Sequence, residues 1–129
     1  MDMLPVRVLL VDDRYDFRKA FKERLSYHYP SAVIEDAGGG DETLQKIKEA
    51  APHLIFMDIR MPGMNGLQLT QKIKKERPDT RIAILTSYDL PEYRQAALGC
   101  GADHFFVKSS LQWDEIVTFV KSVPTENTF

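Results

Sequence analysis

The chain has 129 residues, of which 43% are hydrophobic and 28% charged, a composition that suits one compact domain and argues against intrinsic disorder. Its net charge of −2 and the lack of any Lys/Arg cluster argue against direct binding of nucleic acid. No apolar stretch approaches a membrane span, no secretion signal is visible at Met1, and the only cysteine, Cys100, cannot form an internal disulfide, so we expect a cytoplasmic protein.

Five short apolar runs recur along the chain at roughly regular intervals, each bounded by turn or charged residues. Continuous apolar runs are typical of strands that are buried on both faces, as in a parallel sheet. These predicted strands are Val6–Val11, Ala32–Glu35, Leu54–Met57, Arg81–Leu85 and His104–Val107.

Segments with helical periodicity separate the predicted strands. Their apolar residues recur every three or four positions, which places them on one face of a helix. The sets are Phe17, Phe21 and Leu25; Leu44, Ile47 and Ala51; and Trp113, Ile116, Val117 and Val120.

The fourth helix carries sequence signals at both ends. Asp89 followed three residues later by Glu92 predicts a capping box, with Pro91 inside the first turn. Gly99 and Gly101 suit the exit of the same helix. Its predicted buried stripe is small and consists of Tyr93, Ala96, Ala97 and Cys100.

Ser109 with Gln112 predicts the start of the final helix in the same way. Strands that alternate with helices imply right-handed crossovers and a sheet covered on both sides. The predicted fold is therefore α/β: a flavodoxin-like (βα)5 domain with a doubly wound, five-stranded parallel sheet. It spans residues 1–123, and residues 124–129 form a tail or the start of a linker.

Polar side chains follow the predicted strands where each strand ends. They are Asp12, Asp13, Asp58, Thr86 and Lys108. In open α/β sheets the ligand crevice lies at the carboxyl ends of the strands, near the point where strand order reverses. The sequence therefore predicts one site with three carboxylates, a hydroxyl and an ammonium group.

Three carboxylates in one crevice repel one another. Two unit charges about 5 Å apart at an effective dielectric constant near 20 cost roughly 3 kcal/mol. Lys108 can offset part of this cost, and a divalent cation can offset more. Oxygen ligands with few neighbouring His or Cys residues favour Mg²⁺. Such a site suits phosphoryl transfer, in which a carboxylate can act as nucleophile.

Four motifs carry a family resemblance: "VLLVDD", "LIFMDIRMPGMNG", "IAILTS" and "FFVKSS". In this order and spacing they resemble the receiver domain of bacterial two-component response regulators, over about Val6 to Val123. The resemblance implies that Asp58 is the phosphoacceptor. It also implies that Asp12 and Asp13, with Asp58 and the backbone carbonyl of Arg60, hold Mg²⁺, Asp13 being the more direct ligand.

The resemblance also implies a switch. Thr86 would hydrogen-bond the phosphoryl group, Lys108 would pair with it, and Phe105 would turn inward as Thr86 moves. The output surface would be the fourth helix, fifth strand and fifth helix, which could bind a second copy or an output domain. The phosphoryl group would come from a phosphohistidine of a sensor histidine kinase, and the domain would catalyse both the transfer and its own later dephosphorylation.

Four positions depart from the common family pattern. Ser109 replaces a proline that often follows the lysine in a cis peptide, so we expect a trans bond there. Arg60 and Tyr88 are bulky and flank the expected path of an attacking water, so we predict slow hydrolysis. Phe105 has no hydroxyl, so its switching must work through packing alone.

Two other functions remain as alternatives. One is a receiver-like interaction module that is never phosphorylated. The other is a haloacid-dehalogenase-type phosphatase, which would need Asp-x-Asp where this chain has Asp12-Asp13-Arg14.

The output of the domain is a separate question. The "DDRYDFR" segment and Ser109-Ser110 look more like the NarL/FixJ-like subgroup, whose members commonly carry a LuxR-type helix-turn-helix. The chain could thus act alone or belong to a transcription regulator. Cys100 is predicted to be a small buried hydrophobe, and Trp113 a core residue.

Overall fold

The computed structural model describes residues 5–125, in which strands and helices alternate along the chain. The strands are β1 (Arg7–Val11), β2 (Val33–Ala37), β3 (Leu54–Met57), β4 (Arg81–Thr86) and β5 (His104–Val107). The helices are α1 (Tyr15–His28), α2 (Gly40–Glu49), α3 (Gly66–Glu76), α4 (Pro91–Gly99) and α5 (Trp113–Ser122), with a 3₁₀ turn at Lys108–Ser110.

The five strands form one parallel sheet in the order β2-β1-β3-β4-β5. The chain first pairs β2 with one edge of β1 and then crosses to pair β3 with the other edge. Strand order thus reverses between β1 and β3, which opens a crevice at their carboxyl ends. This is the doubly wound, flavodoxin-like α/β fold that the sequence predicts.

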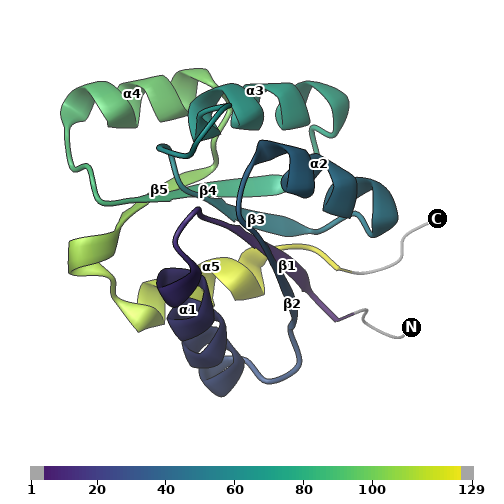
Figure 1. The fold of residues 1–129 in the computed structure, drawn as a ribbon. Coiled ribbons are helices and arrows are strands. Elements are labelled where there is room, and N and C mark those ends of the chain that lie inside the picture. The colour runs from purple at the N-terminus through teal and green to yellow at the C-terminus, as the bar shows by residue number, and fades with distance from the viewer. Residues whose placement is uncertain (1–4, 126–129) are drawn as a thin grey trace.

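Helices cover both faces of the sheet, with α2, α3 and α4 on one side and α1 and α5 on the other (Figure 1). Strand β3 lies at the centre and is buried on both faces. Ile55 and Met57 pack towards the first group of helices, and Leu54 and Phe56 towards the second. Full burial of such side chains contributes about 1.5–3 kcal/mol each, so β3 fixes the position of the loop that follows it.

Two predicted boundaries were wrong. Strand β2 runs from Val33 to Ala37 rather than from Ala32 to Glu35, because its register carries Ala37 to the end of β1, opposite Val11. Ala51 is exposed and lies beyond α2, which ends at Glu49. A proline disfavours the helical conformation of the residue before it, and Pro52 directly follows Ala51.

The predicted capping box of α4 was also wrong. The helix begins at Pro91 with Leu90 as N-cap, and no side chain caps it. Asp89 instead pairs with Arg94 at 3.2 Å. The prediction of Pro91 in the first turn was confirmed, and so was the glycine exit, since Gly101 has a φ of +95°.

The final helix does not begin at a Ser109 cap. The chain after β5 forms the 3₁₀ turn, so α5 starts at Trp113 with Gln112 as N-cap and without a side-chain hydrogen bond. The bond between Lys108 and Ser109 is trans, as predicted, since residues 5–125 contain no cis peptide.

The buried stripe of α4 is smaller than predicted. Only Ala97 is buried, Tyr93 and Cys100 are partly buried, and Ala96 is exposed. The prediction of a buried Cys100 was therefore wrong, because α4 packs one narrow face against the sheet. Little apolar burial holds this helix in place.

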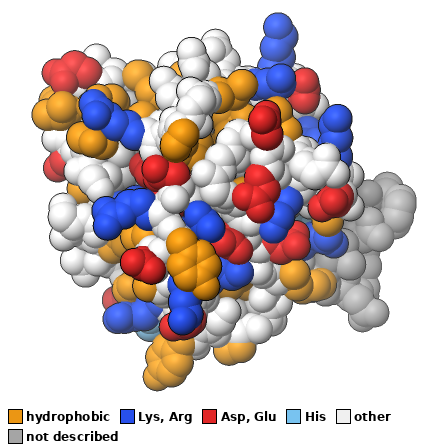
Figure 2. Space-filling model, viewed as in Figure 1, with side chains coloured by type: hydrophobic (Ala, Val, Ile, Leu, Met, Phe, Trp, Pro, Cys, Tyr) orange, Lys and Arg blue, Asp and Glu red, His pale blue; other side chains and the backbone are white. Residues whose placement is uncertain are grey.

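Positive and negative side chains are interspersed on the face shown in Figure 2, and no broad basic surface is visible there. Within residues 5–125, no helix combines the length and the apolar character needed to span a membrane.

Candidate functional site

The polar residues predicted at the strand ends lie at one edge of the sheet. Carboxylate oxygens of Asp12, Asp13 and Asp58 lie within 4.8 Å of one another. Lys108 Nζ donates to Asp12 Oδ2 at 2.6 Å and to Asp58 Oδ2 at 3.5 Å. The structure thus brings together four residues that are delivered by β1, β3 and β5.

Backbone hydrogen bonds fix the two buried carboxylates. The amide of Asp12 donates to the Ala37 carbonyl at 3.1 Å, and that of Asp58 donates to the Val11 carbonyl at 2.9 Å. The sheet pairing therefore continues one residue beyond each strand. Asp58 Oδ1 accepts a hydrogen bond from the Ile59 amide at 2.8 Å, and among residues 5–125 Oδ2 has only the long contact to Lys108.

Burial makes the Asp58 carboxylate unusually basic. The side chain is 9% exposed. Loss of solvation raises the pKa of Asp58 to about 6, with a further increase from the charge of Asp12, while Lys108 and the Ile59 amide lower it. A carboxyl with this pKa is mostly ionised at pH 7, so it can act as a nucleophile.

Lys108 is held by more than the two acids. Its side chain is 13% exposed, and its Nζ lies 4.1 Å from the centre of the Phe17 ring on α1. An ammonium over an aromatic face is attracted by the electron-rich centre of the ring. Helical periodicity predicts Phe17 only as a core position, because it does not show which ring contacts the lysine.

Thr86 is fully buried at the end of β4, next to β3 in the sheet. Its hydroxyl accepts a long hydrogen bond of 3.4 Å from the Tyr88 amide. In the sheet register it lies opposite Val107, which directly precedes Lys108. Its backbone thus belongs to the same edge of the sheet as the lysine.

Gly66 is a site residue that the sequence analysis missed. A Cβ there would lie 1.8 Å from the carbonyl oxygen of Asp58, so no side chain fits without moving the backbone of the loop. Its amide donates to the Ile59 carbonyl at 2.7 Å. The preceding Asn65 caps α3 by accepting from Gln68. The only sequence signal was the "MNG" at the end of the quoted motif.

An aromatic cluster covers the loop beside the acids. The Arg60 guanidinium lies 4.4 Å from the centre of the Tyr88 ring and donates to the Tyr93 hydroxyl at 3.3 Å. The two tyrosine rings are 5.6 Å apart. Arg60 thus connects the loop after β3 to the first turns of α4.

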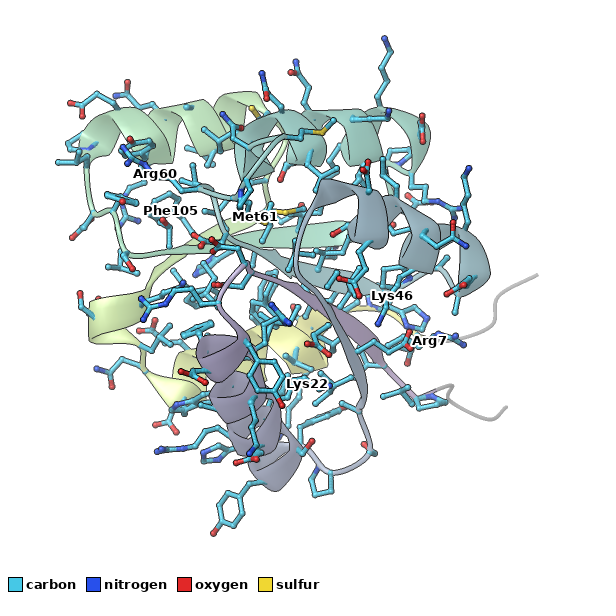
Figure 3. The ribbon with its side chains drawn as sticks, viewed as in Figure 1. Arg7, Lys22, Lys46, Arg60, Met61 and Phe105 are labelled. Carbon is cyan, nitrogen blue, oxygen red and sulfur yellow. The ribbon has the colours of Figure 1, made fainter. Side chains whose placement is uncertain are left out.

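Phe105 on β5 is partly buried, and the Arg94 guanidinium of α4 lies 4.7 Å from its ring centre. Figure 3 shows Phe105 and Arg60 on the same side of the sheet, beneath α4. The predicted switch residue therefore contacts the helix that is least firmly packed.

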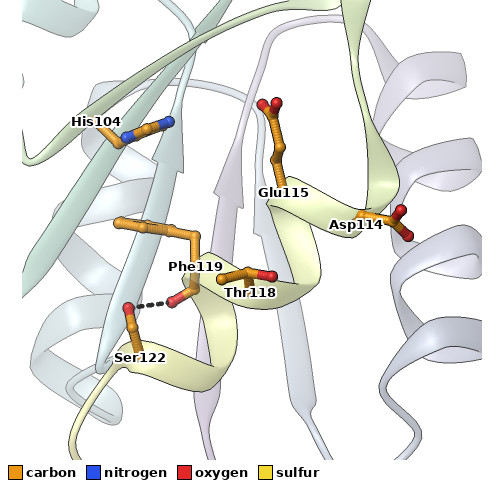
Figure 4. Close-up of a pocket in the computed structure, with 6 residues that line it drawn as sticks. All are labelled: His104, Asp114, Glu115, Thr118, Phe119 and Ser122. Carbon is orange, nitrogen blue, oxygen red and sulfur yellow. Dashed lines mark hydrogen bonds between the residues drawn. The ribbon is translucent and has the colours of Figure 1, made fainter.

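A separate hollow of about 400 Å³ lies between β5 and α5; Asp114 and Glu115 of α5 are among its lining residues, and none of the strand-end residues of the candidate site is. Figure 4 shows His104 stacked on Phe119 in its lining, and the ring centres are 5.4 Å apart. Trp113 at the start of α5 packs on Phe21 and stacks on His28.

Comparisons with known proteins agree on one family. The model of the response regulator receiver domain matches residues 8–121. The chain is 32% identical over 128 residues to response regulator protein VraR of Staphylococcus saprophyticus, covering 98% of this chain and 60% of that protein. It is 33% identical over 125 residues to oxygen regulatory protein NreC of Staphylococcus epidermidis, covering 96% and 57%. The chain thus spans about three-fifths of the length of these relatives.

A solved structure shows a similar level of sequence identity. Response regulator TrrA of Thermotoga maritima, crystallised in complex with Mg²⁺-BeF, superposes with a TM-score of 0.80 at 35% identity and covers 92% of this chain and 98% of that one.

Proposed function

Since the chain belongs to the response regulator receiver domain family, we propose that it is a phosphorylation switch in which Asp58 accepts a phosphoryl group from a sensor histidine kinase. The observation that carries this proposal is the gathering of Asp12, Asp13, Asp58 and Lys108 at one sheet edge. If these charged residues served only to keep the surface soluble, four of them from three strands would not need to lie together.

The reaction would be an in-line transfer. Asp58 Oδ2, the less engaged oxygen, attacks phosphorus as the bond to the donor's imidazole nitrogen breaks, which gives an aspartyl phosphate and a neutral histidine once nitrogen is protonated. Lys108 pairs with the new phosphoryl oxygens, and the Thr86 hydroxyl leaves the Tyr88 amide to hydrogen-bond one of them. Water later hydrolyses the acyl phosphate, which the domain itself catalyses.

The donor set fits a hard divalent cation. All three acidic groups offer oxygen, and their oxygens lie within 4.8 Å of one another. The pKa of Asp58 is raised mainly by burial, which the charge of Lys108 offsets only in part, and Asp12 raises it by a smaller amount. Asp12, Asp13, Asp58 and the backbone carbonyl of Arg60 would hold Mg²⁺, with exposed Asp13 the more direct ligand. The ion would supply positive charge for the transferred oxygens.

The response would pass through α4. Movement of Thr86 empties space into which Phe105 turns, and this breaks its contact with Arg94. Since α4 is held by one buried residue, Ala97, a small change suffices to shift it. The surface of α4, β5 and α5 would then bind a second copy or an output domain.

The domain bounds, location and output of the protein are further parts of this proposal. Residues 1–123 would form the receiver and residues 124–129 a tail or linker; residues 1–4 and 126–129 lie outside the described residues. In the cytoplasm, such a domain would control transcription through a helix-turn-helix output domain, or act alone through protein contacts.

The test is phosphorylation with a small phosphodonor such as acetyl phosphate. We expect the wild type to gain the mass of one phosphoryl group with Mg²⁺ and not with EDTA, and Asp58→Asn to gain none. Folded wild type that gains no mass under any of these conditions would favour a receiver-like interaction module that is never phosphorylated.

A further inference from the structure

Arg18 on α1 joins the site to the edge of the sheet. Its Nη1 donates to the backbone carbonyl of Asp12 at 2.7 Å, and its Nε donates to Asp36 Oδ2 on β2 at 2.6 Å. The arginine side chain is 16% exposed. One rigid guanidinium thus connects α1, β2 and the first turn after β1.

The carbonyl that Arg18 holds belongs to the peptide between the two N-terminal acids. Because a peptide group is planar, fixing the Asp12 carbonyl also fixes the direction in which Asp13 leaves the strand. Asp12 itself is already anchored through its amide and both carboxylate oxygens. Exposed Asp13 depends on the peptide plane for its orientation.

Asp36 serves as the anchor for Arg18. Its second oxygen accepts from Lys22 at 2.8 Å, so both oxygens are engaged. Burial alone would raise the pKa of Asp36, but hydrogen bonds from Lys22 and Arg18 outweigh burial and lower it. The carboxylate therefore stays charged at neutral pH and keeps the guanidinium in place.

The neighbouring glycine leaves room for this arrangement. A Cβ at Gly38 would lie 3.3 Å from Nη1 of Arg18. That distance is tighter than most Cβ contacts, so an alanine there would require the guanidinium to shift by a few tenths of an ångström. Gly38 thus lies directly beside the guanidinium that holds the Asp12 carbonyl.

We propose that Arg18 is a positioning residue for the magnesium site: by holding the Asp12 carbonyl, it orients Asp13 towards the ion. This inference rests on the proposed function, because it concerns the same ion. The metal site would then depend on residues of α1 and β2 as well as on the strand ends that supply the ligands.

Charge and geometry predict opposite effects of removing Arg18. Loss of a positive charge near an acidic site would strengthen cation binding, whereas loss of orientation would weaken it. Lys22 offers a matched control, since Lys22→Met removes the same formal charge and one bond to Asp36 while it leaves the Asp12 carbonyl bound. Figure 3 labels Lys22 on α1.

The experiment is calorimetric titration of Mg²⁺ into folded Arg18→Met, Arg18→Lys and Lys22→Met proteins. We expect roughly tenfold weaker binding for Arg18→Met, since groups that orient metal ligands commonly contribute this much. Arg18→Lys keeps the charge, but one ammonium cannot reproduce the two-pronged contact, so its affinity should also fall. Lys22→Met should remain within about twofold of the wild type.

A metal-free measurement separates orientation from general stability. The Asp13 amide should show a lower NMR order parameter in Arg18→Met than in Lys22→Met, with both proteins compared well below their unfolding midpoints. If Arg18→Met does not fold, Gly38→Ala replaces it and should weaken Mg²⁺ binding in the same direction.

Two results would overturn the proposal in different ways. Equal Mg²⁺ affinities for Arg18→Met and Lys22→Met, with a wild type that binds the ion, would refute the role of Arg18 alone. A folded wild type that binds no Mg²⁺ would refute the proposed metal site, and the role of Arg18 with it.

Discussion

Replacing Asp58 by Asn should stabilise the metal-free protein at neutral pH. The carboxylate is buried, and its raised pKa means that the folded state holds the charged form less well than the unfolded state does. Asparagine has nearly the same shape without the charge. The substitution that abolishes phosphorylation should therefore also relieve a cost that the site imposes on the fold.

The size of the effect follows from the pKa. It rises from the ordinary 3.8 to about 6, and each pKa unit corresponds to about 1.4 kcal/mol, which gives an upper value of about 3 kcal/mol. Water in the crevice screens part of this charge, and the new amide must find partners of its own. We expect a gain of about 2 kcal/mol at pH 7.

The gain should depend on pH with a defined sign. Between about pH 4 and pH 6 the unfolded wild type has lost the Asp58 proton while the folded state still keeps it, so wild-type stability falls as pH rises through this window. Above about pH 7 the difference is constant. The advantage of Asp58→Asn should therefore be complete at pH 7 and nearly absent at pH 4.

The assay is urea unfolding in EDTA at both pH values. Asp89→Asn is the control, because that side chain is 65% exposed and its loss should change stability by less than about 0.5 kcal/mol. An Asp58→Asn protein no more stable than the wild type at pH 7, or one with an equal gain at pH 4, would refute the reasoning.

Further predictions concern the loops around the site. Gly66→Ala should lower the free energy of unfolding in urea by more than about 2 kcal/mol, because its Cβ would meet a backbone carbonyl. Gly99→Ala meets nothing and should raise the free energy of unfolding by about 0.5–1 kcal/mol. Equal effects of the two substitutions would contradict the close packing at Gly66. Asp13→Asn should abolish the rise in Tm on adding Mg²⁺ while leaving metal-free stability within about 0.5 kcal/mol, since the side chain is exposed; an undiminished rise would exclude Asp13 as a ligand. Replacing Arg60 and Tyr88 together by Ala should shorten the lifetime of the phosphorylated protein, measured by mass spectrometry after removal of the phosphodonor, and an unchanged lifetime would count against their shielding role.

Much of the fold was predictable because its signals are strong and local. Continuous apolar runs predict strands, and β1, β3 and β4 are buried as such runs indicate, whereas the edge strand β2 is largely exposed or partly buried. Polar residues at the strand ends meet at one edge once the strands are parallel. Asp12 and Asp58 follow directly from this reasoning, since each lies one residue past a buried strand.

The failures share a physical cause, which is competition between local signals and tertiary contacts. Asp89 has the spacing of a cap, but its carboxylate pairs with Arg94 and the helix starts later. Ser109 lies in a 3₁₀ turn. The contacts of Phe17 with Lys108 and of Arg18 with Asp12 depend on how α1 sits on the sheet, which no periodicity specifies.

The most direct test of the account is to locate the phosphoryl group. Protein phosphorylated with Mg²⁺ and acetyl phosphate would be treated with borohydride, which reduces an aspartyl phosphate to homoserine, and then digested for peptide mass spectrometry. The account predicts homoserine at position 58 alone. Modification at Asp12 or Asp13, or phosphorylation that persists in Asp58→Asn, would contradict it.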